Sequence, residues 1–383
     1  MKKLLISLFA IFAFTVAANA AGKYDNPDTL VVARDGSGEF RTIQEAVEAC
    51  RAFMEYTKVI YVKKGTYKEK LIIPQSLKNV QIVGEDRDNT IITYDDHANI
   101  RMPGTEQKMG TFRTFTLNVR GFGITFKNLT IENNAPKLGQ AVALHTEGDR
   151  LSFINCRILG NQDTIYTGNE GTRLFFKGCH IEGTTDFIFG PSIAWFEDCT
   201  ILSRRNSYIT AASTPQNQQY GYIFNNCRIV AGEGVDKVYL GRPWRDYGYT
   251  LFMNCELGKH ICPEGWHRWE PQREKTARYM EYNNRGEGAD TSKRVGWSRQ
   301  LTKKEAKEIT IETELHNIEE DEVTTQYSTD GGETWNDYTG PITISDNGTI
   351  EVRTITNEDE TVIGTAEKTI DNINPRSEIT ITV

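Results

Sequence analysis

The sequence contains little that could hold a metal ion. Its six histidines do not cluster at ligand spacing, and none of its seven cysteines belongs to a Cys-x-x-Cys pair. We therefore predict no metal and no cofactor. The sequence also lacks a basic run and any nucleic-acid-binding motif, which argues against a nucleic-acid partner. The apolar run from Leu4 to Ala17 is too short for a stable membrane span.

The N-terminus has the pattern of a secretory signal peptide. Lys2 and Lys3 precede the apolar run, and Ala18-Asn-Ala20 supplies the small residues of a cleavage site. Residues 1–20 are therefore predicted to be a signal peptide, and the protein is expected to be exported to the periplasm or the cell exterior. No cysteine follows the predicted cleavage site, so we expect no lipid anchor there.

Charge is unevenly distributed along the chain. The net charge is −8, and the segment 309–383 alone contains 17 acidic and 3 basic residues. The rest of the chain contains 35 acidic and 41 basic residues. The mildly basic balance of this larger part is compatible with an acidic polymer as partner.

A six-residue block recurs along the chain. It has Phe or Leu first, Asn, Gly or Asp third, an apolar residue fourth and Ile or Leu sixth. From the second block on, the steps between blocks are 27, 23, 20, 28 and 28 residues, a loose period typical of a solenoid. The fourth positions are Val80, Leu129, Cys156, Cys179, Cys199, Cys227 and Cys255.

The apolar phase within each block shifts by one residue at the third position. Asn and Gly tolerate left-handed backbone, so a sharp corner at this position would explain the shift. Strand, corner and strand in each repeat predict a parallel β-helix. Its interior would hold stacked Phe, Cys, Leu and Ile side chains. We interpret the five block cysteines as small buried hydrophobic residues rather than disulfide partners.

Two aspartates follow equivalent blocks. Asp163 and Asp186 are 23 residues apart, and each lies seven residues after a block cysteine, Cys156 or Cys179. The β-helix predicts that they occupy the same place on adjacent coils, where strands lie roughly 4.7–4.9 Å apart. Two carboxyl groups that close cannot both ionise cheaply, so one would be an acid and the other a charged base or nucleophile. The alternative is that both only hydrogen-bond to turns of the coil.

Other patterns flank the repeats. Thr42-Ile-Gln-Glu45 is a capping box that predicts an amphipathic helix to about Met54, which would close the open end of the coil. A long polar loop without an assignable pattern lies between Asp95 and Thr111. After residue 309, short alternating strands with turn signals predict a small β-sandwich.

These observations predict a fold class and a domain organisation. We predict an all-β protein, a parallel β-helix followed by a small β-sandwich module. The predicted parts are a signal peptide (1–20), the β-helix domain (21–302), a hinge (303–308) and the sandwich (309–383). The last part resembles the immunoglobulin-like modules appended to bacterial secreted enzymes. We expect the protein to be a monomer.

Six short motifs, in order between about Val31 and Trp297, resemble those of pectin methylesterases (pectinesterases). The family fold is a right-handed parallel β-helix, in agreement with the spacing of the blocks. The resemblance implies hydrolysis of methyl esters in pectin, an acidic polysaccharide, with release of methanol. The motifs are Gly65-Thr-Tyr-Lys-Glu69, Gln140-Ala-Val-Ala-Leu144, Gln162-Asp-Thr164, Asp186-Phe-Ile-Phe-Gly190, Leu240-Gly-Arg-Pro-Trp244 and Gly265-Trp-His-Arg-Trp269.

The resemblance also implies a catalytic role for each matching residue. Asp186 would attack the ester carbonyl carbon. Asp163 would protonate the departing methanol and then activate the water that cleaves the acyl-enzyme. Gln162 would donate to the developing oxyanion, with Gln140 lining the same site. Arg242 would hold Asp186 ionised and oriented.

Four further residues are candidates for contact with the substrate. Trp244 would offer a face to a sugar ring, and Thr116 matches a substrate-contacting position. Tyr166 and Phe187 could line the groove. The three aromatic residues also have a structural interpretation, because large aromatic side chains usually bury much of their surface. Likewise, Gln140 and Gln162 could be corner-stabilising amides, and Arg242 a structural ion-pair partner.

Two other functions are compatible with a β-helix. Two carboxyl groups about 5 Å apart would suit a retaining glycosidase, so a polygalacturonan depolymerase, either hydrolase or lyase, is one alternative. A calcium-dependent lyase would need a larger acidic cluster than this pair. A non-catalytic carbohydrate-binding β-helix is the other alternative, because this fold hosts many functions.

Overall fold

A computed structural model describes residues 28–311, 323–338, 342–344, 346–356, 362–371 and 379–381. The predicted signal peptide, residues 1–20, lies outside these ranges. Within them, no helix has the length and apolar character needed to cross a membrane.

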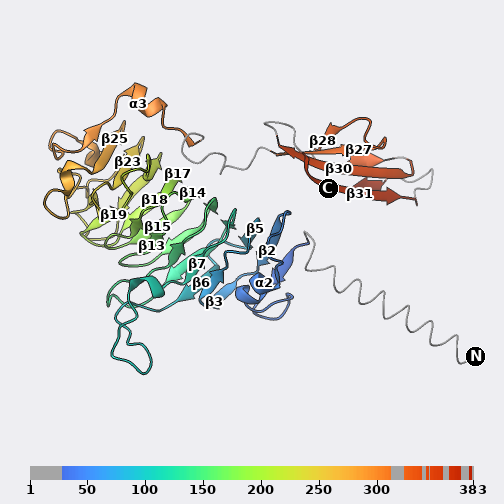
Figure 1. Cartoon of the computed structure of the whole chain (residues 1–383), viewed down its shortest axis with the longest axis horizontal. Helices are drawn as coiled ribbons and strands as arrows, with labels where there is room; N and C mark the ends of the chain where they lie inside the picture. Colours follow the sequence, from blue (N-terminus) through green and yellow to red (C-terminus); the bar gives the residue numbers. More distant parts are fainter. Residues whose placement is uncertain are drawn as a thin grey trace, which may run out of the picture. The chain divides into compact units, whose positions relative to one another are not determined.

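Three parallel sheets form the first part of the chain, and most turns of the coil contribute one strand to each sheet (Figure 1). The first sheet contains β1 (Leu30–Val32), β2 (Lys58–Val62), β5 (Val80–Gly84), β8 (Thr125–Lys127), β11 (Leu151–Ile154), β14 (Arg173–Lys177), β17 (Ile193–Glu197), β20 (Tyr222–Asn225), β23 (Tyr249–Met253), β25 (Arg278–Tyr282) and β26 (Arg299–Gln300). The second contains β3 (Gly65–Lys68), β6 (Thr90–Tyr94), β9 (Thr130–Asn133), β12 (Arg157–Leu159), β15 (His180–Gly183), β18 (Thr200–Ser203), β21 (Arg228–Ala231) and β24 (Glu256–Leu257). The third contains β4 (Leu71–Ile73), β7 (Leu117–Val119), β10 (Leu144–Thr146), β13 (Ile165–Thr167), β16 (Ile188–Gly190), β19 (Tyr208–Ala212) and β22 (Tyr239–Gly241).

The interior of the coil is built from the stacks that the blocks predict. Six phenylalanine rings, one per coil, lie nearly parallel with centroids 4.3–5.3 Å apart. All seven cysteines are buried and unpaired, so the block cysteines pack as small hydrophobic residues as expected. The stacked rings are Phe126, Phe153, Phe176, Phe196, Phe224 and Phe252.

The third block position is a left-handed corner, as the phase shift predicts. The residues there have φ between 49° and 62°, and they are Asn128, Asn155, Gly178, Asp198, Asn226 and Asn254. Their side chains also pair along the coil, since Asn155 Nδ2 donates to Asn128 Oδ1 at 2.8 Å. A corner that needs positive φ explains why Asn, Asp and Gly recur here.

The first block, 77–82, does not align with the others as predicted. Ile82, its sixth residue, pairs with Phe126, the first residue of the next block. The strand β5 therefore belongs to the first sheet and follows the block's third residue, Asn79, which is also left-handed with φ of 58°. Gly84 ends the strand, where a Cβ would lie 2.3 Å from the Asn128 carbonyl oxygen. Sequence similarity within a short apolar block could not distinguish the two registers.

A helix closes the N-terminal end of the coil. Helix α2 (Ile43–Ala49) begins with the predicted capping box of Thr42 and Glu45, and it buries Ile43, Ala46 and Val47 in the core. It ends earlier than predicted. The chain becomes extended at Cys50 and the N–H of Phe53 donates to the Ser76 carbonyl oxygen, so the helix cannot reach Met54.

The chain divides into two compact units, Met1–His316 and Asn317–Val383. The segment expected as a hinge, 303–308, contains the short helix α3 (Lys303–Lys307), which has its own capping box of Thr302 and Glu305. Three 3-10 turns, η1 (Thr111–Arg113), η2 (Arg273–Lys275) and η3 (Glu287–Ala289), complete the first unit's elements.

The second unit consists of antiparallel strands, as predicted. One sheet contains β27 (Val323–Ser328), β28 (Asn336–Asp337), β30 (Gly348–Thr356) and β31 (Val362–Ile370). The other pairs β29 (Ile342–Ile344) with β32 (Ile379–Ile381). The likeness to immunoglobulin-like modules and the domain limits 309–383 remain predictions.

Candidate active site

Asp163 and Asp186 lie at equivalent points of neighbouring coils. Each lies two residues before the start of a strand of the third sheet, and the pairing of Ile165 with Ile188 sets them in register. Both adopt left-handed backbone, with φ of 65° and 49°. Their N–H groups donate to carbonyl oxygens of the following coil, so their side chains are free to point away from the turn. Because one coil of the β-helix takes up these 23 residues, the two aspartates lie next to each other on adjacent coils.

Arg242 binds one of the two aspartates. Its Nε donates to Asp186 Oδ1 at 2.9 Å and its Nη2 to Asp186 Oδ2 at 2.6 Å. The guanidinium lies between two aromatic rings, 3.9 Å from the centroid of Tyr208 and 3.8 Å from that of Trp269. This sandwich and the two parallel hydrogen bonds fix the orientation of Asp186.

The surroundings act differently on the pKa values of the two carboxyl groups. Burial and the neighbouring Asp186 raise the pKa of Asp163 well above its usual value, against a smaller opposing effect of Arg242. Burial also raises the pKa of Asp186, but there Arg242 opposes it by direct hydrogen bonds and charge. The pKa of Asp163 is therefore raised further than that of Asp186, which makes Asp186 the better candidate for a carboxylate and Asp163 the better candidate for an acid.

The two aspartates open into a pocket of about 330 Å³. All five predicted catalytic residues line this pocket, and so does Trp244. Among the described residues, the side-chain amides of Gln140 and Gln162 have no hydrogen-bond partner, so their donors are available to a bound molecule. The lining residues are Thr111, Phe112, Gln140, Gln162, Asp163, Asp186, Phe189, Ala211, Arg242, Trp244 and Trp269.

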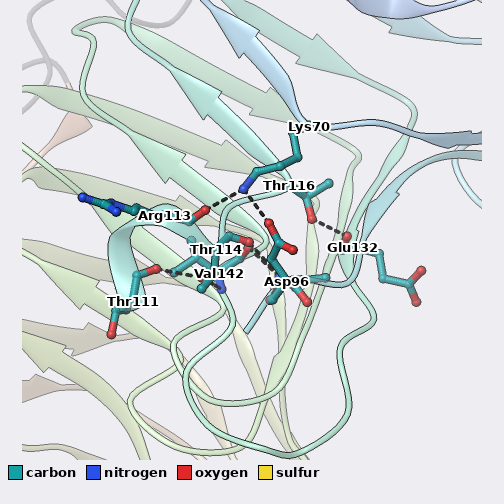
Figure 2. A network of polar contacts seen from close by, with 9 residues as sticks. Lys70, Asp96, Thr111, Arg113, Thr114, Thr116, Glu132 and Val142 are labelled. Carbon is teal, nitrogen blue, oxygen red and sulfur yellow. Dashed lines mark hydrogen bonds and ion pairs between the residues drawn. The ribbon is translucent and has the colours of Figure 1, made fainter. Parts of the chain in front are cut away.

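Two predicted substrate contacts lie elsewhere. Thr116 is fully buried, and its hydroxyl donates to the Glu132 carbonyl oxygen at 2.8 Å, so it is a structural residue (Figure 2). Phe187 is also fully buried and packs in the core of the coil. Tyr166 lies beside the pocket, with its ring 4.8 Å from Phe112 and 4.9 Å from Phe189.

Several pocket residues were not predicted individually. Phe189 rather than Phe187 faces the pocket. Phe187 precedes strand β16 and packs in the core like Ile188, the first residue of the strand, so the alternation that starts at Ile188 turns Phe189 outward. Trp269 belongs to the motif Gly265-Trp-His-Arg-Trp269, whose pattern alone predicts no role for it. Thr111 and Phe112 come from the loop that had no assignable pattern. No periodic signal could have placed them at the pocket.

Within the described ranges, no group of three or more His, Cys, Asp or Glu side chains is arranged to hold a metal ion. The absence of a metal from the reaction stays a prediction. The pocket brings together two carboxyl groups, a guanidinium and two side-chain amides.

The fold and this pocket define a class of protein: a parallel β-helix with a carboxyl pair and an arginine at its third sheet. Residues 29–318 match the family model described as Pectinesterase. The chain belongs to the pectinesterase family.

Curated relatives and solved structures agree with this assignment. A pectinesterase/pectinesterase inhibitor of Brassica campestris is 37% identical over 286 residues, which are 71% of this chain and 49% of that protein. The chain spans about half the length of the curated relatives that it matches.

The structure of a pectin methylesterase from carrot has a TM-score of 0.71 and 35% identity, covering 76% of this chain and 93% of that one. A solved pectin methylesterase in complex with a hexasaccharide has a TM-score of 0.65 and 29% identity, covering 75% of this chain and 97% of that one. These matches confirm the predicted fold class, a right-handed parallel β-helix.

Proposed function

We propose that this protein hydrolyses methyl esters of homogalacturonan, giving methanol and de-esterified pectate. One observation carries the proposal: Arg242 donates two parallel hydrogen bonds to the carboxyl group of Asp186, while burial and Asp186 raise the pKa of the neighbouring Asp163. A nucleophile and an acid are thus present together in one pocket. The family membership and the names of the relatives support the same reaction.

In the first half of the reaction, an oxygen of Asp186 attacks the ester carbonyl carbon. The carbonyl oxygen becomes an oxyanion, to which the amides of Gln162 and Gln140 can donate. When the tetrahedral intermediate collapses, the bond to the methoxy oxygen breaks. Asp163 gives its proton to that oxygen, so methanol leaves and an acyl anhydride with Asp186 remains.

In the second half, Asp163 is a carboxylate and acts as a base. It takes a proton from a water molecule as the water oxygen attacks the acyl carbon. The second tetrahedral intermediate expels Asp186 as a carboxylate, which Arg242 stabilises, and leaves a galacturonate carboxyl group. Both aspartates are then ready for another cycle.

The substrate is a polysaccharide chain in this proposal. The related enzyme solved with a hexasaccharide supports a polymeric ligand, and the mildly basic balance of residues outside 309–383 suits an acidic one. Trp244 and, beside the pocket, Tyr166 are the proposed sugar contacts. We further propose that the protein acts as an exported monomer, in the periplasm or outside the cell, because the N-terminus has a signal-peptide pattern.

The test measures methanol and acid released from highly methylated pectin while polymer length is followed in parallel. We expect methanol release without shortening by the wild type and loss of release in Asp186→Asn. Asp198→Asn is the matched control, since Asp198 is a left-handed corner of the next coil and does not line the pocket. It should retain full activity.

Two other outcomes would overturn the proposal. Shortening of the polymer would identify a depolymerase, because only such an enzyme creates new chain ends. Pectin binding without methanol release, equal in the wild type and in Asp186→Asn, would identify a carbohydrate-binding protein.

A further inference from the structure

The loop between β6 and β7 supplies one wall of the pocket. Its outer part is a hairpin closed by backbone hydrogen bonds from Gly110 to Ala98 and from Met109 to Ile100, of 3.0 and 2.8 Å. The chain then enters η1, where Thr111 and Phe112 line the pocket. Because this segment is not a strand of the coil, contacts outside the sheets must hold it in place.

Backbone contacts tie both ends of the loop to a buried asparagine. Asn133 Nδ2 lies 3.0 Å from the carbonyl oxygens of Asp96 and Thr114, at the beginning and the end of the loop. The hydroxyl of Thr114 also donates to the Thr111 carbonyl oxygen at 2.7 Å and accepts from the Val142 N–H at 2.9 Å (Figure 2). These bonds fix the chain on either side of η1. The carbonyl oxygen of Arg113, the last residue of η1, has a separate partner.

Lys70 is that partner. It immediately precedes β4, and its ammonium group donates to the carbonyl oxygen of Arg113 at 2.6 Å and to Asp96 Oδ2 at 2.7 Å (Figure 2). The ammonium also lies 4.7 Å from the centroid of the Phe115 ring. One cation therefore joins the two ends of the loop to the body of the coil.

The surroundings make this contact stronger than an ordinary surface ion pair. The side chains of Lys70 and Asp96 are only 28% and 16% exposed. The neighbouring ion pair of Lys68 with Asp95 has a similar distance, 2.9 Å, but its side chains are 55% and 48% exposed and it bonds to no residue of η1. Exposed pairs contribute little, whereas a partly buried charged hydrogen bond is costly to lose.

We propose that Lys70 is a positioning residue: through Arg113 and Asp96 it holds η1 so that Thr111 and Phe112 form the pocket wall for the polysaccharide. The proposal rests on the proposed function for its substrate. Lys70 does not line the pocket and takes no part in the chemistry. Phe112 is 46% exposed and its ring lies 4.8 Å from Tyr166, so the two rings together offer an apolar face to a sugar.

The first experiment measures steady-state methanol release by Lys70→Met, which removes the charge and keeps the length of the side chain. We expect KM for methylated pectin to rise about 5–30-fold with kcat within about twofold, because binding is lost and the reacting groups are untouched. Lys70→Arg, which keeps the charge and the donors, should recover most of the affinity. Lys68→Met, the matched control, should leave both constants unchanged.

A double-mutant cycle with Phe112→Ala shows whether Lys70 acts through η1. If it does, Lys70→Met changes KM less than twofold in the Phe112→Ala background. Multiplicative effects of the two substitutions would overturn the proposal, as would equal effects of Lys70→Met and Lys68→Met.

Hydrogen exchange gives a readout that does not depend on activity. Amides of residues 98–113 should exchange at least about tenfold faster in Lys70→Met than in the wild type, and Lys68→Met should not change them. If the wild type releases no methanol, the proposed function fails but the anchor is still tested by this exchange. Unchanged exchange in Lys70→Met would overturn the anchor even if the enzyme is active. Should Lys70→Met not fold, Asp96→Asn removes the same ion pair and takes its place.

Discussion

Arg242 engages both carboxylate oxygens of Asp186, although the two residues are 56 positions apart in the chain. The side chain of Asp186 is 7% exposed and that of Arg242 20% exposed, so water screens the pair only weakly. This ion pair gives Asp186 a charged partner that Asp163, at the equivalent place on the neighbouring coil, does not share. Asp163, one coil away, lacks such a partner among the described residues, and its pKa is raised further than that of Asp186.

Replacing Arg242 should therefore impair Asp186 as a nucleophile. We expect Arg242→Gln to lower kcat/KM by about 10²-fold, as for the loss of charged hydrogen bonds worth about 1.5–3 kcal/mol. Without the guanidinium the pKa of Asp186 rises further, so the acidic limb of the pH profile of kcat/KM should move to higher pH. Arg268→Gln, at an exposed arginine, is the control. An unmoved acidic limb would contradict the assignment.

Asp163 should lower stability at neutral pH. Burial and Asp186 raise its pKa in the folded protein, so the folded state binds more protons than the unfolded one above about pH 4. The free energy of unfolding therefore decreases as pH rises toward the folded pKa. In Asp163→Asn this loss disappears, while activity drops by about 10²–10⁴-fold.

Thermal unfolding of the wild type and Asp163→Asn between pH 4 and pH 8 measures this effect. The difference in Tm should increase in favour of the variant as pH rises. A variant that is less stable than the wild type to the same extent at every pH would show that Asp163 is a structural residue.

The phenylalanine stack should dominate the stability of the coil. The Phe176 ring lies 4.8 Å from Phe153 and 4.6 Å from Phe196 and is fully buried. Phe176→Ala would leave a cavity in the middle of the stack and should cost about 3–5 kcal/mol. Phe53→Ala, at a 69% exposed ring, should change stability by less than about 0.5 kcal/mol. Urea unfolding of both variants provides the comparison.

Substitutions of Gly178 test whether the corners require a residue that tolerates positive φ. Its φ is 62°, and a Cβ there would meet no atom within 4 Å, so a substitution changes backbone strain and not packing. Gly178→Ala should cost about 1 kcal/mol, whereas Gly178→Asn should be nearly neutral because Asn tolerates this region. Equal destabilisation by the two substitutions in urea unfolding would refute the role of the corner.

The sequence predicted the coil because the repeat is local and periodic. Corner residues that tolerate positive φ recur between apolar positions, and the same pattern brings Asp163 and Asp186 into register from their spacing alone. Where the apolar block lacked phenylalanine and cysteine, at 77–82, the register was predicted wrongly. Short apolar blocks fit two registers, and only pairing with neighbouring strands selects one.

What lies outside the repeat was decided by the tertiary structure. The family motif named Arg242, but only the folded coil shows its two hydrogen bonds to Asp186 and its place between Tyr208 and Trp269. Phe189, not Phe187, faces the pocket because the strand, and with it the alternation of side chains, begins only at Ile188. The loop that carries Thr111 and Phe112 has no period, so its place depends on long-range contacts to Lys70 and Asn133. Sequence periodicity determines how the coils stack, whereas contacts between distant segments determine which side chains meet in the pocket.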